Sequence, residues 1–212
     1  MLAIRLLLIG ILALSASCAP VAESLITDDS PLQLPAPGAH QLRILAPAML
    51  ELTLITTKKS ISARVDQWDF VDDQARARLP VPGEFIVSTE GQPIAVKAIG
   101  FKRRVLYAPL KRRDLRIGNY LYLQLQKPVA ENQTVEVENP SRKLWPKETS
   151  FTGKAEPLRW SPAIHVNQTG YLPQYPKKAM VGFYLGSLGE LNLSEGQGSP
   201  NEAQLGFKLI EA

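Results

Sequence analysis

Cysteine and histidine are scarce in this sequence of 212 residues, which holds one cysteine and two histidines. A single cysteine excludes a disulfide framework and a cysteine-rich zinc site. The two histidines, His40 and His165, are too few for a typical zinc centre, so no metal ligands are expected. The chain also lacks a Gly-x-Ser-x-Gly nucleophile elbow, a phosphate-binding loop and a dinucleotide-binding glycine run. No cofactor is therefore expected, and no catalytic residues of these classes are present.

A large excess of charge of one sign is missing as well. The formal net charge of +4 is too small to require a polyanionic partner, and nucleic acid is not expected as one. Hydrophobic residues make up 45% of the chain and charged residues 21%, which is the composition of a globular protein rather than a disordered one.

The first 18 residues have the pattern of an export signal. Arg5 precedes the apolar run Leu6–Leu14, and the small residues Ser15–Ser17 follow. The run is too short for a membrane-spanning helix. Cys18 comes directly afterwards, as in the processing site of bacterial lipoproteins, and is the predicted lipidation site. Because Ser15 stands where such signals carry a bulky residue, an incidental cysteine in an ordinary signal is the alternative.

Export places the protein in the periplasm, in the outer membrane or on the cell surface, and contact with a membrane is expected only through the lipid anchor. Residues 19–41 hold four prolines among small and polar residues without sustained periodicity. They are predicted to be a proline-rich linker, which could tether a folded body.

Short alternating runs dominate the sequence from residue 42 onward. Met49–Thr57 alternates leucines with other residues, and Thr134–Glu138 alternates valines with polar residues. Tyr120–Gln126 predicts leucines facing inward and tyrosines facing outward. Glu84–Thr89 and Ile94–Phe101 are predicted as a hairpin with a turn at residues 90–93, followed by a short strand, Val105–Ala108. No window favours a four-turn amphipathic helix, so residues 42–160 are predicted to form an all-β, antiparallel β-sandwich domain.

Three clusters of chemically active side chains have structural explanations. The acidic stretch with Asp66, Asp69, Asp72 and Asp73 fits neither a calcium loop nor a framed pair of glycosidase acids, and an exposed loop is expected. Basic residues at 102–104, 111–113 and 116 could bind an anionic polymer, but protection of an exposed strand edge is favoured. The tryptophans are expected to be core or junction anchors rather than a sugar-binding platform; they are Trp68, Trp145 and Trp160.

The most informative stretch is Pro162–Val181, PAIHVNQTGYLPQYPKKAMV. Its prolines exclude a helix and predict two extended runs, Ala163–Asn167 and Lys178–Tyr184, joined by a rigid turn. The stretch resembles the first strands of the immunoglobulin-like domain that precedes the catalytic helical barrel in many family 9 glycoside hydrolases, the cellulases and their relatives. Residues 161–212 would then be part of such a domain.

This resemblance implies a non-catalytic role. In the family the immunoglobulin-like domain packs against the barrel, and the catalytic acids lie in the barrel, which has no counterpart in these 212 residues. The partner would be that barrel in the same chain, with polysaccharide as substrate. The contact would be made by residues of the resembling motif: His165, Asn167, Gln168, Gly170, Tyr171 and Pro173. The alternatives are a free-standing envelope module that binds carbohydrate or mediates adhesion, and a fragment with no role.

Overall fold

The computed structural model describes residues 34–58, 65, 67–74, 76–109, 114–167 and 169–191. The predicted signal and Cys18 lie outside these residues, as does most of the predicted linker. The strands are β1 (His40–Ala46), β2 (Met49–Thr57), β3 (Ile86–Thr89), β4 (Gln92–Ile94), β5 (Val96–Tyr107), β6 (Arg116–Leu125), β7 (Thr134–Glu138), β8 (Phe151–Lys154), β9 (Ile164–Val166) and β10 (Ala179–Val181). Two short 3-10 helices, η1 (Pro82–Glu84) and η2 (Gly186–Leu188), complete the described elements.

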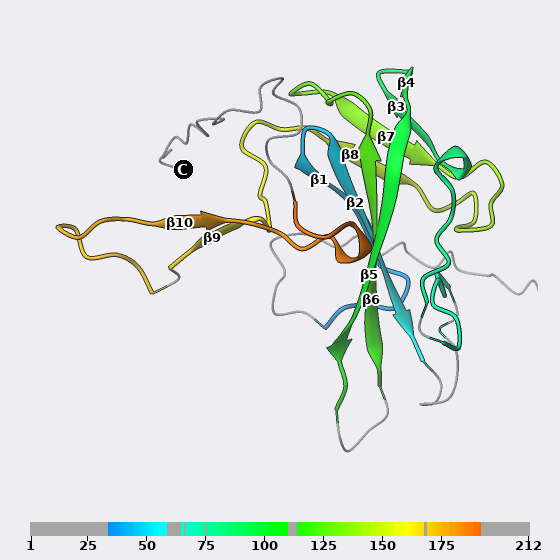
Figure 1. The fold of residues 1–212 in the computed structure, drawn as a ribbon, viewed down its shortest axis with the longest axis horizontal. Helices are drawn as coiled ribbons and strands as arrows, with labels where there is room; N and C mark the ends of the chain where they lie inside the picture. Colours follow the sequence, from blue (N-terminus) through cyan, green and yellow to red (C-terminus); the bar gives the residue numbers. More distant parts are fainter. Residues whose placement is uncertain are drawn as a thin grey trace, which may run out of the picture.

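Two four-stranded antiparallel sheets form the body of the molecule (Figure 1). The first sheet has the order β1-β2-β6-β5, and the second has the order β4-β3-β7-β8. The predicted all-β antiparallel class is confirmed. In the part of the chain that the structure describes, no helix is long and apolar enough to cross a membrane.

The alternating leucines and valines form the core between the two sheets. Leu50, Leu52 and Leu121 are fully buried on the inner face of the first sheet. Val135 and Phe151 face them from the second sheet. Because a fully buried leucine contributes roughly 1.5–3 kcal/mol relative to an exposed one, this layer supplies most of the apolar burial.

Three predicted strand boundaries differ from the structure. The chain turns at Glu90 and Gly91, so Gln92 and Pro93 belong to strand β4, which pairs with β3. The predicted break before Val105 is absent, since β5 runs without interruption through the basic residues 102–104 and pairs with β6. Strand β1 begins at His40, inside the last residues predicted as linker.

The outer face of the first sheet is covered by residues 183–191, which we call the strap. Leu185 and Leu191 are buried in a second apolar cluster with Tyr120 and Tyr122 of β6. The tyrosines point away from the sandwich core, as their alternation predicts. They are nevertheless buried, because the strap covers them.

The strap approaches β5 closely enough to need glycine on both sides. A Cβ atom added to Gly186 would lie 2.1 Å from the Phe101 carbonyl oxygen, and one added to Gly100 would lie 2.6 Å from the Leu188 side chain. The Phe101 amide donates a hydrogen bond to Ser187 Oγ over 3.0 Å. Lys102 Nζ donates to the Tyr184 carbonyl over 3.0 Å and lies 4.3 Å from the ring centre of Phe183.

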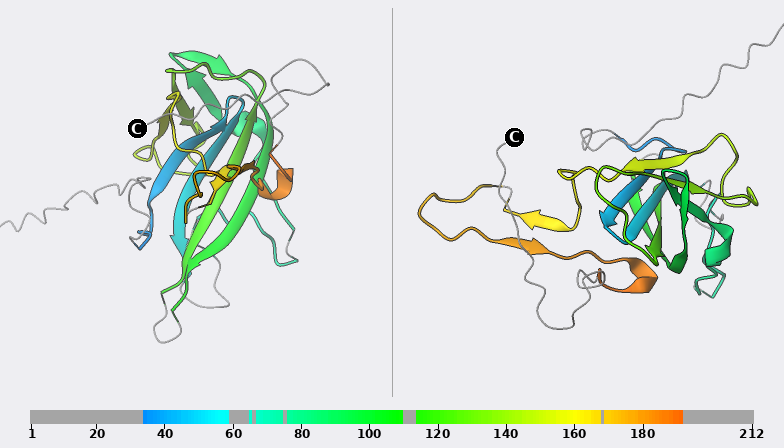
Figure 2. Two further views of the ribbon diagram at one scale, coloured as in Figure 1. Left: turned by 90° about the vertical axis from the view of Figure 1, so that its left-hand side faces the viewer. Right: turned by 90° about the horizontal axis from the view of Figure 1, so that it is seen from above.

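Strands β9 and β10 form a separate two-stranded hairpin, which extends away from the sandwich (Figures 1 and 2). All six of its strand residues are exposed. At the base of the hairpin the Gly182 amide donates to the Ala163 carbonyl over 2.9 Å, and Ala163 is buried in the same cluster as the strap. The hairpin therefore has a fixed base and an exposed body.

We expect Gly186→Ala to destabilise the protein more than Gly91→Ala, at the turn between β3 and β4. Both glycines have a positive φ, of +63° and +75°, but only Gly186 is crowded, since a Cβ on Gly91 would meet nothing within 4 Å. Each substitution incurs the left-handed cost of about 1–2 kcal/mol, and the crowding at Gly186 adds about 1–3 kcal/mol. Denaturant unfolding measures the difference, and amide exchange at Phe101 should accelerate only in Gly186→Ala. Equal loss in both variants would show that the strap is not packed on β5.

Candidate functional site

The candidate site lies at the end of the second sheet where β7 and β8 are joined by a loop of residues 139–150. Strand β7 alternates, so that Val135 and Val137 are buried while Glu136 and Glu138 are exposed. Thr152 of β8 is the cross-strand partner of Glu136. This alternation places polar side chains beside the loop.

Specific hydrogen bonds fix the 139–150 loop to the sandwich. Asn139 Nδ2 donates to the Glu84 carbonyl over 2.9 Å, and Asn139 Oδ1 accepts from the Leu144 amide over 3.0 Å. Trp68 Nε1 donates to the Leu144 carbonyl over 2.9 Å. Because Asn139 and Trp68 are buried, these bonds hold the loop in one conformation.

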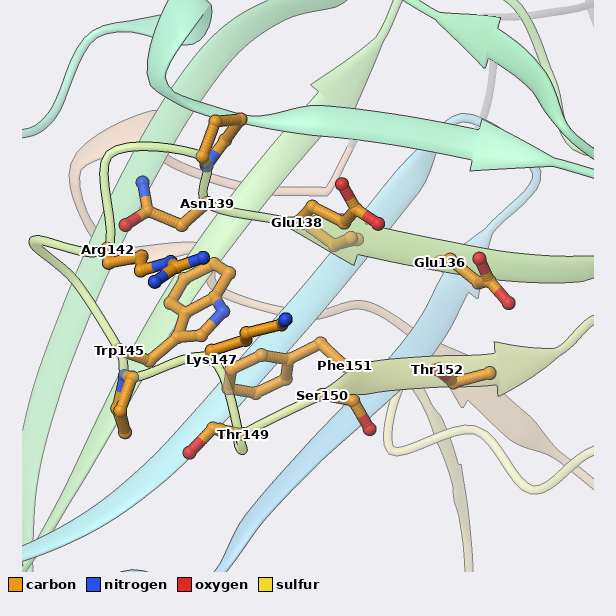
Figure 3. A pocket seen from close by; sticks show the side chains of 13 residues that line it. Glu136, Glu138, Asn139, Arg142, Trp145, Lys147, Thr149, Ser150, Phe151 and Thr152 are labelled. Atoms are coloured by element: carbon orange, nitrogen blue, oxygen red, sulfur yellow. The ribbon is translucent and has the colours of Figure 1, made fainter.

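The loop and the two strands enclose a pocket of about 410 Å³ (Figure 3). The rings of Trp145 and Phe151 form its apolar wall, with ring centres 4.8 Å apart. In the view of Figure 3, Arg142 and Lys147 lie around the indole of Trp145. The remaining lining is mainly polar and comes from β7, the loop and β8: Glu136, Glu138, Asn139, Thr149, Ser150 and Thr152, with Val137, Pro140 and Pro146.

Arg142 has an unusual backbone. Its φ is +55°, a left-handed conformation that costs a residue with a side chain about 1–2 kcal/mol relative to the ordinary helix region. The Arg142 amide donates to the Asn139 carbonyl over 3.0 Å, which closes a turn that contains Pro140. Glycine fits such a position more easily, so the arginine side chain is retained at an energetic cost.

A second polar cluster lies on the outer face of the first sheet. Arg43, Glu51 and Tyr122 are neighbours in register across β1, β2 and β6. The Glu51 side chain is 1% exposed, and its Oε1 atom lies 3.5 Å from Arg43 Nη1. In the described part of the chain, neither Glu51 oxygen nor the Tyr122 hydroxyl has a hydrogen-bond partner. A buried carboxyl group with so little compensation is costly to ionise.

The pKa values of this cluster reflect burial. Burial raises the pKa of the Glu51 carboxyl above its ordinary value, although Arg43, then Tyr122 and Lys102, act in the opposite direction. Burial also raises the pKa of the Tyr122 hydroxyl, and the nearby Glu51 adds to the effect. Burial lowers the pKa of Lys102, partly offset by Glu51. Glu51 and Tyr122 are fully buried, which indicates a structural role for the cluster.

The residues of the predicted contact motif organise the hairpin connection. Tyr171 Oη accepts from the Asn167 amide over 3.0 Å and donates to the Lys178 carbonyl. Asn167 Nδ2 donates to the Gly170 carbonyl over 2.9 Å, with Gly170 at a φ of +94°. His165 Nε2 lies 3.0 Å from the Gly182 carbonyl oxygen.

The described residues of the motif, including Pro173, are therefore all exposed on the hairpin and its connection. Gln168 lies outside the described residues.

The other predicted clusters have structural roles. Asp72 closes a local turn by accepting hydrogen bonds from the amides of Gln74 and Arg76 over 3.0 and 2.9 Å. Asp66 lies outside the described residues. Trp68 and Trp145 are core residues, as expected, whereas Trp160 is exposed beneath the Arg43 guanidinium, 4.8 Å from its ring centre. Within the described ranges, no group of three His, Cys, Asp or Glu side chains could hold a metal ion.

The basic stretch lies on an edge strand, since β5 is the last strand of the first sheet. Its side chains are less solvated than expected. Arg103 donates to the Trp68 carbonyl, to Asp69 and to Asn119 over 2.6, 3.2 and 2.8 Å. It thereby fastens the segment before β3 to the sheet. Residues 111–113 lie outside the described residues.

Comparisons of the chain with protein-family models, curated proteins and solved structures find no match. The pocket beside Trp145 was not predicted from the sequence, because its residues are spread over two strands and a loop. The one feature of the sequence that could have indicated the pocket is the long polar connection between Thr134–Glu138 and the next apolar residues.

We expect Glu51→Gln to flatten the pH dependence of stability. Burial raises the pKa of Glu51 above the ordinary glutamate value of 4.5. At a pH between 4.5 and the raised pKa, the folded state therefore binds more protons than the unfolded state. The wild-type free energy of unfolding must then fall as pH rises above about 4.5, by about 1.4 kcal/mol per unit of pKa difference. Urea unfolding from pH 4 to pH 8 measures the slope. Glu138→Gln, at an exposed glutamate of β7, is the control, and identical slopes for wild type and Glu51→Gln would contradict the assignment.

Proposed function

We propose that this chain is the non-catalytic N-terminal portion of an exported polysaccharide hydrolase of the family 9 type. In this proposal residues 161–212 contribute strands of an immunoglobulin-like domain that supports a catalytic helical barrel. The resemblance of Pro162–Val181 suggests the family. The observation that carries the proposal is the exposed apolar surface of the β9–β10 hairpin.

The hairpin exposes far more apolar surface than a finished unit would. Met180 is 72% exposed and Leu172 is 66% exposed. Further large side chains are exposed on the same hairpin and its connection: Ile164, Val166, Tyr171, Tyr175 and Val181. A two-stranded hairpin is only marginally stable in water, and exposed apolar surface on this scale is typical of an interaction site. The hairpin therefore suits a role as the edge of a larger sandwich that packs against another domain.

The rigidity of the connection supports the same role. Lys177 Nζ donates to the Leu172 and Tyr175 carbonyls over 3.1 and 2.9 Å and also to the Pro173 carbonyl. Pro173 and Pro176 fix their own backbone and extend the residues before them. An exposed turn with this many internal bonds is pre-organised for binding, which lowers the entropy lost on contact.

We expect the chain, through its hairpin, to raise the melting temperature of a separately purified family 9 catalytic barrel. Met180→Ser in the chain should weaken that effect. Loss of an apolar contact should reduce the rise in the melting temperature of the barrel, because a ligand that binds more weakly stabilises its partner less. Differential scanning fluorimetry of the mixture measures the shift.

Leu158→Ser is the matched control for this experiment, since Leu158 is also 72% exposed but lies outside the hairpin. The chain alone should release no reducing ends from soluble β-1,4-glucan, because in the family the pair of catalytic acids lies in the barrel. Hydrolysis by the chain alone, or equal effects of Met180→Ser and Leu158→Ser on the mixture, would argue against the proposal.

Membrane attachment through Cys18 is the second part of the proposal. If Cys18 carries the lipid of a bacterial lipoprotein, the mature protein should partition into the detergent phase of a Triton X-114 separation, and Cys18→Ser should shift it to the aqueous phase. One acyl chain binds membranes only marginally, so stable anchoring requires several. Recovery of all the wild-type protein in the aqueous phase would contradict lipidation, and residues 1–18 would then be interpreted as a plain export signal.

A further inference from the structure

We propose that the pocket under the 139–150 loop binds a segment of a neutral polysaccharide, which gives the sandwich a glycan site of its own. The choice of a β-linked glucan as the first probe rests on the proposed function. The pocket lies on the second sheet, separate from the β9–β10 hairpin (Figures 1 and 3), so the two proposals can fail independently.

The size and lining of the pocket suit a sugar ring. Its volume of about 410 Å³ lies within the roughly 300–1,000 Å³ of typical small-molecule sites. A sugar presents an apolar C–H face and a rim of hydroxyl groups. The pocket addresses chiefly the hydroxyl rim, through the side chains of Thr149 and Ser150 and the charged residues around them, because Trp145 and Phe151 are buried and form only its inner wall.

The charges around the pocket balance. Arg142 and Lys147 provide two cations, and Glu136 and Glu138 provide two carboxylates. All four side chains are exposed, and the structure shows no ion pair for any of them among the residues it describes. They can therefore donate to or accept from sugar hydroxyls, in bonds stronger than those between neutral groups. Equal numbers of both signs give no preference for a polyanion.

The strained backbone of Arg142 is the second observation that favours a ligand. Strain of this kind persists where the surroundings over-determine it, and it clusters at binding sites. Here the bonds of Asn139 and Trp68 fix the loop, and Arg142 lines the pocket. The loop holds the arginine over the pocket before any ligand arrives, which reduces the entropy lost on binding.

The test uses calorimetric titration of the full chain with neutral hexasaccharides: cellohexaose, laminarihexaose and xylohexaose. Amide chemical shifts locate the site. We expect binding of at least one glucan, with shifts confined to the 139–150 loop, β7 and β8. Arg142→Gly should weaken that binding at least tenfold while the melting temperature stays equal or rises, because glycine relieves the positive φ.

Asn132→Gly is the matched control. Asn132 has a φ of +66° in an exposed turn that does not line the pocket, so the substitution relieves similar strain and should leave binding unchanged. A purely structural role for Arg142 predicts a more stable Arg142→Gly variant that binds as tightly as wild type, which would overturn the proposal. It would also be overturned if no neutral hexasaccharide bound at millimolar concentration, or if polygalacturonate bound more tightly.

The outcomes separate the two proposals. Glucan binding together with no effect of the hairpin on a catalytic barrel would retain the pocket and reject the supporting role. The opposite pattern would retain the supporting role and reject the glycan site.

Discussion

The pairing of β2 with β6 is the constraint on which the two layers of this protein depend. The strands pair from Met49 and Gln124 to Thr57 and Arg116 in the middle of the first sheet, and both of their faces are buried. A shift of one residue would exchange the inner and outer side chains along the whole strand. Leu52 would then leave the sandwich core and Glu51 would enter it, where an ionised carboxylate is prohibitively costly. The leucine pattern therefore fixes the register.

The sequence predicts what is local in this arrangement and misses what is distant. Alternation alone predicts the bounds of β2 and β7, because each strand has one face of leucines or valines. It also predicts the direction in which Tyr122 points, but not its burial, because the covering strap comes more than 60 residues later in the chain. The basic residues 102–104 suggested a break in β5 for a related reason. Their partners, including Asn119 and the carbonyl groups of Trp68 and Tyr184, are contributed by other segments.

The pocket shows the same limit at the level of a site. Tryptophan at position 145 suggested a core anchor, and Trp145 is one, since only 6% of its surface is exposed. Its edge becomes part of a pocket wall only because Asn139 and Trp68 hold the neighbouring loop. The left-handed backbone of Arg142 has no signal in the sequence, since arginine is not the residue expected at a positive φ. A conformation that the residue type disfavours is visible only in the fold.

The strap determines how the exposed hairpin is attached to the rest of the molecule. Ala163 and Leu185, at the two ends of the hairpin, are buried in one cluster on the outer face of the first sheet. The Gly182 amide and Ala163 carbonyl join these ends, and Gly186 and Gly100 let the strap pass against β5. A domain that packed on the hairpin would therefore be held at a fixed base rather than on a flexible linker. The apolar contacts of the hairpin could then support a partner domain without a further loss of chain entropy at the junction, since that entropy is already lost when the strap folds onto the sheet.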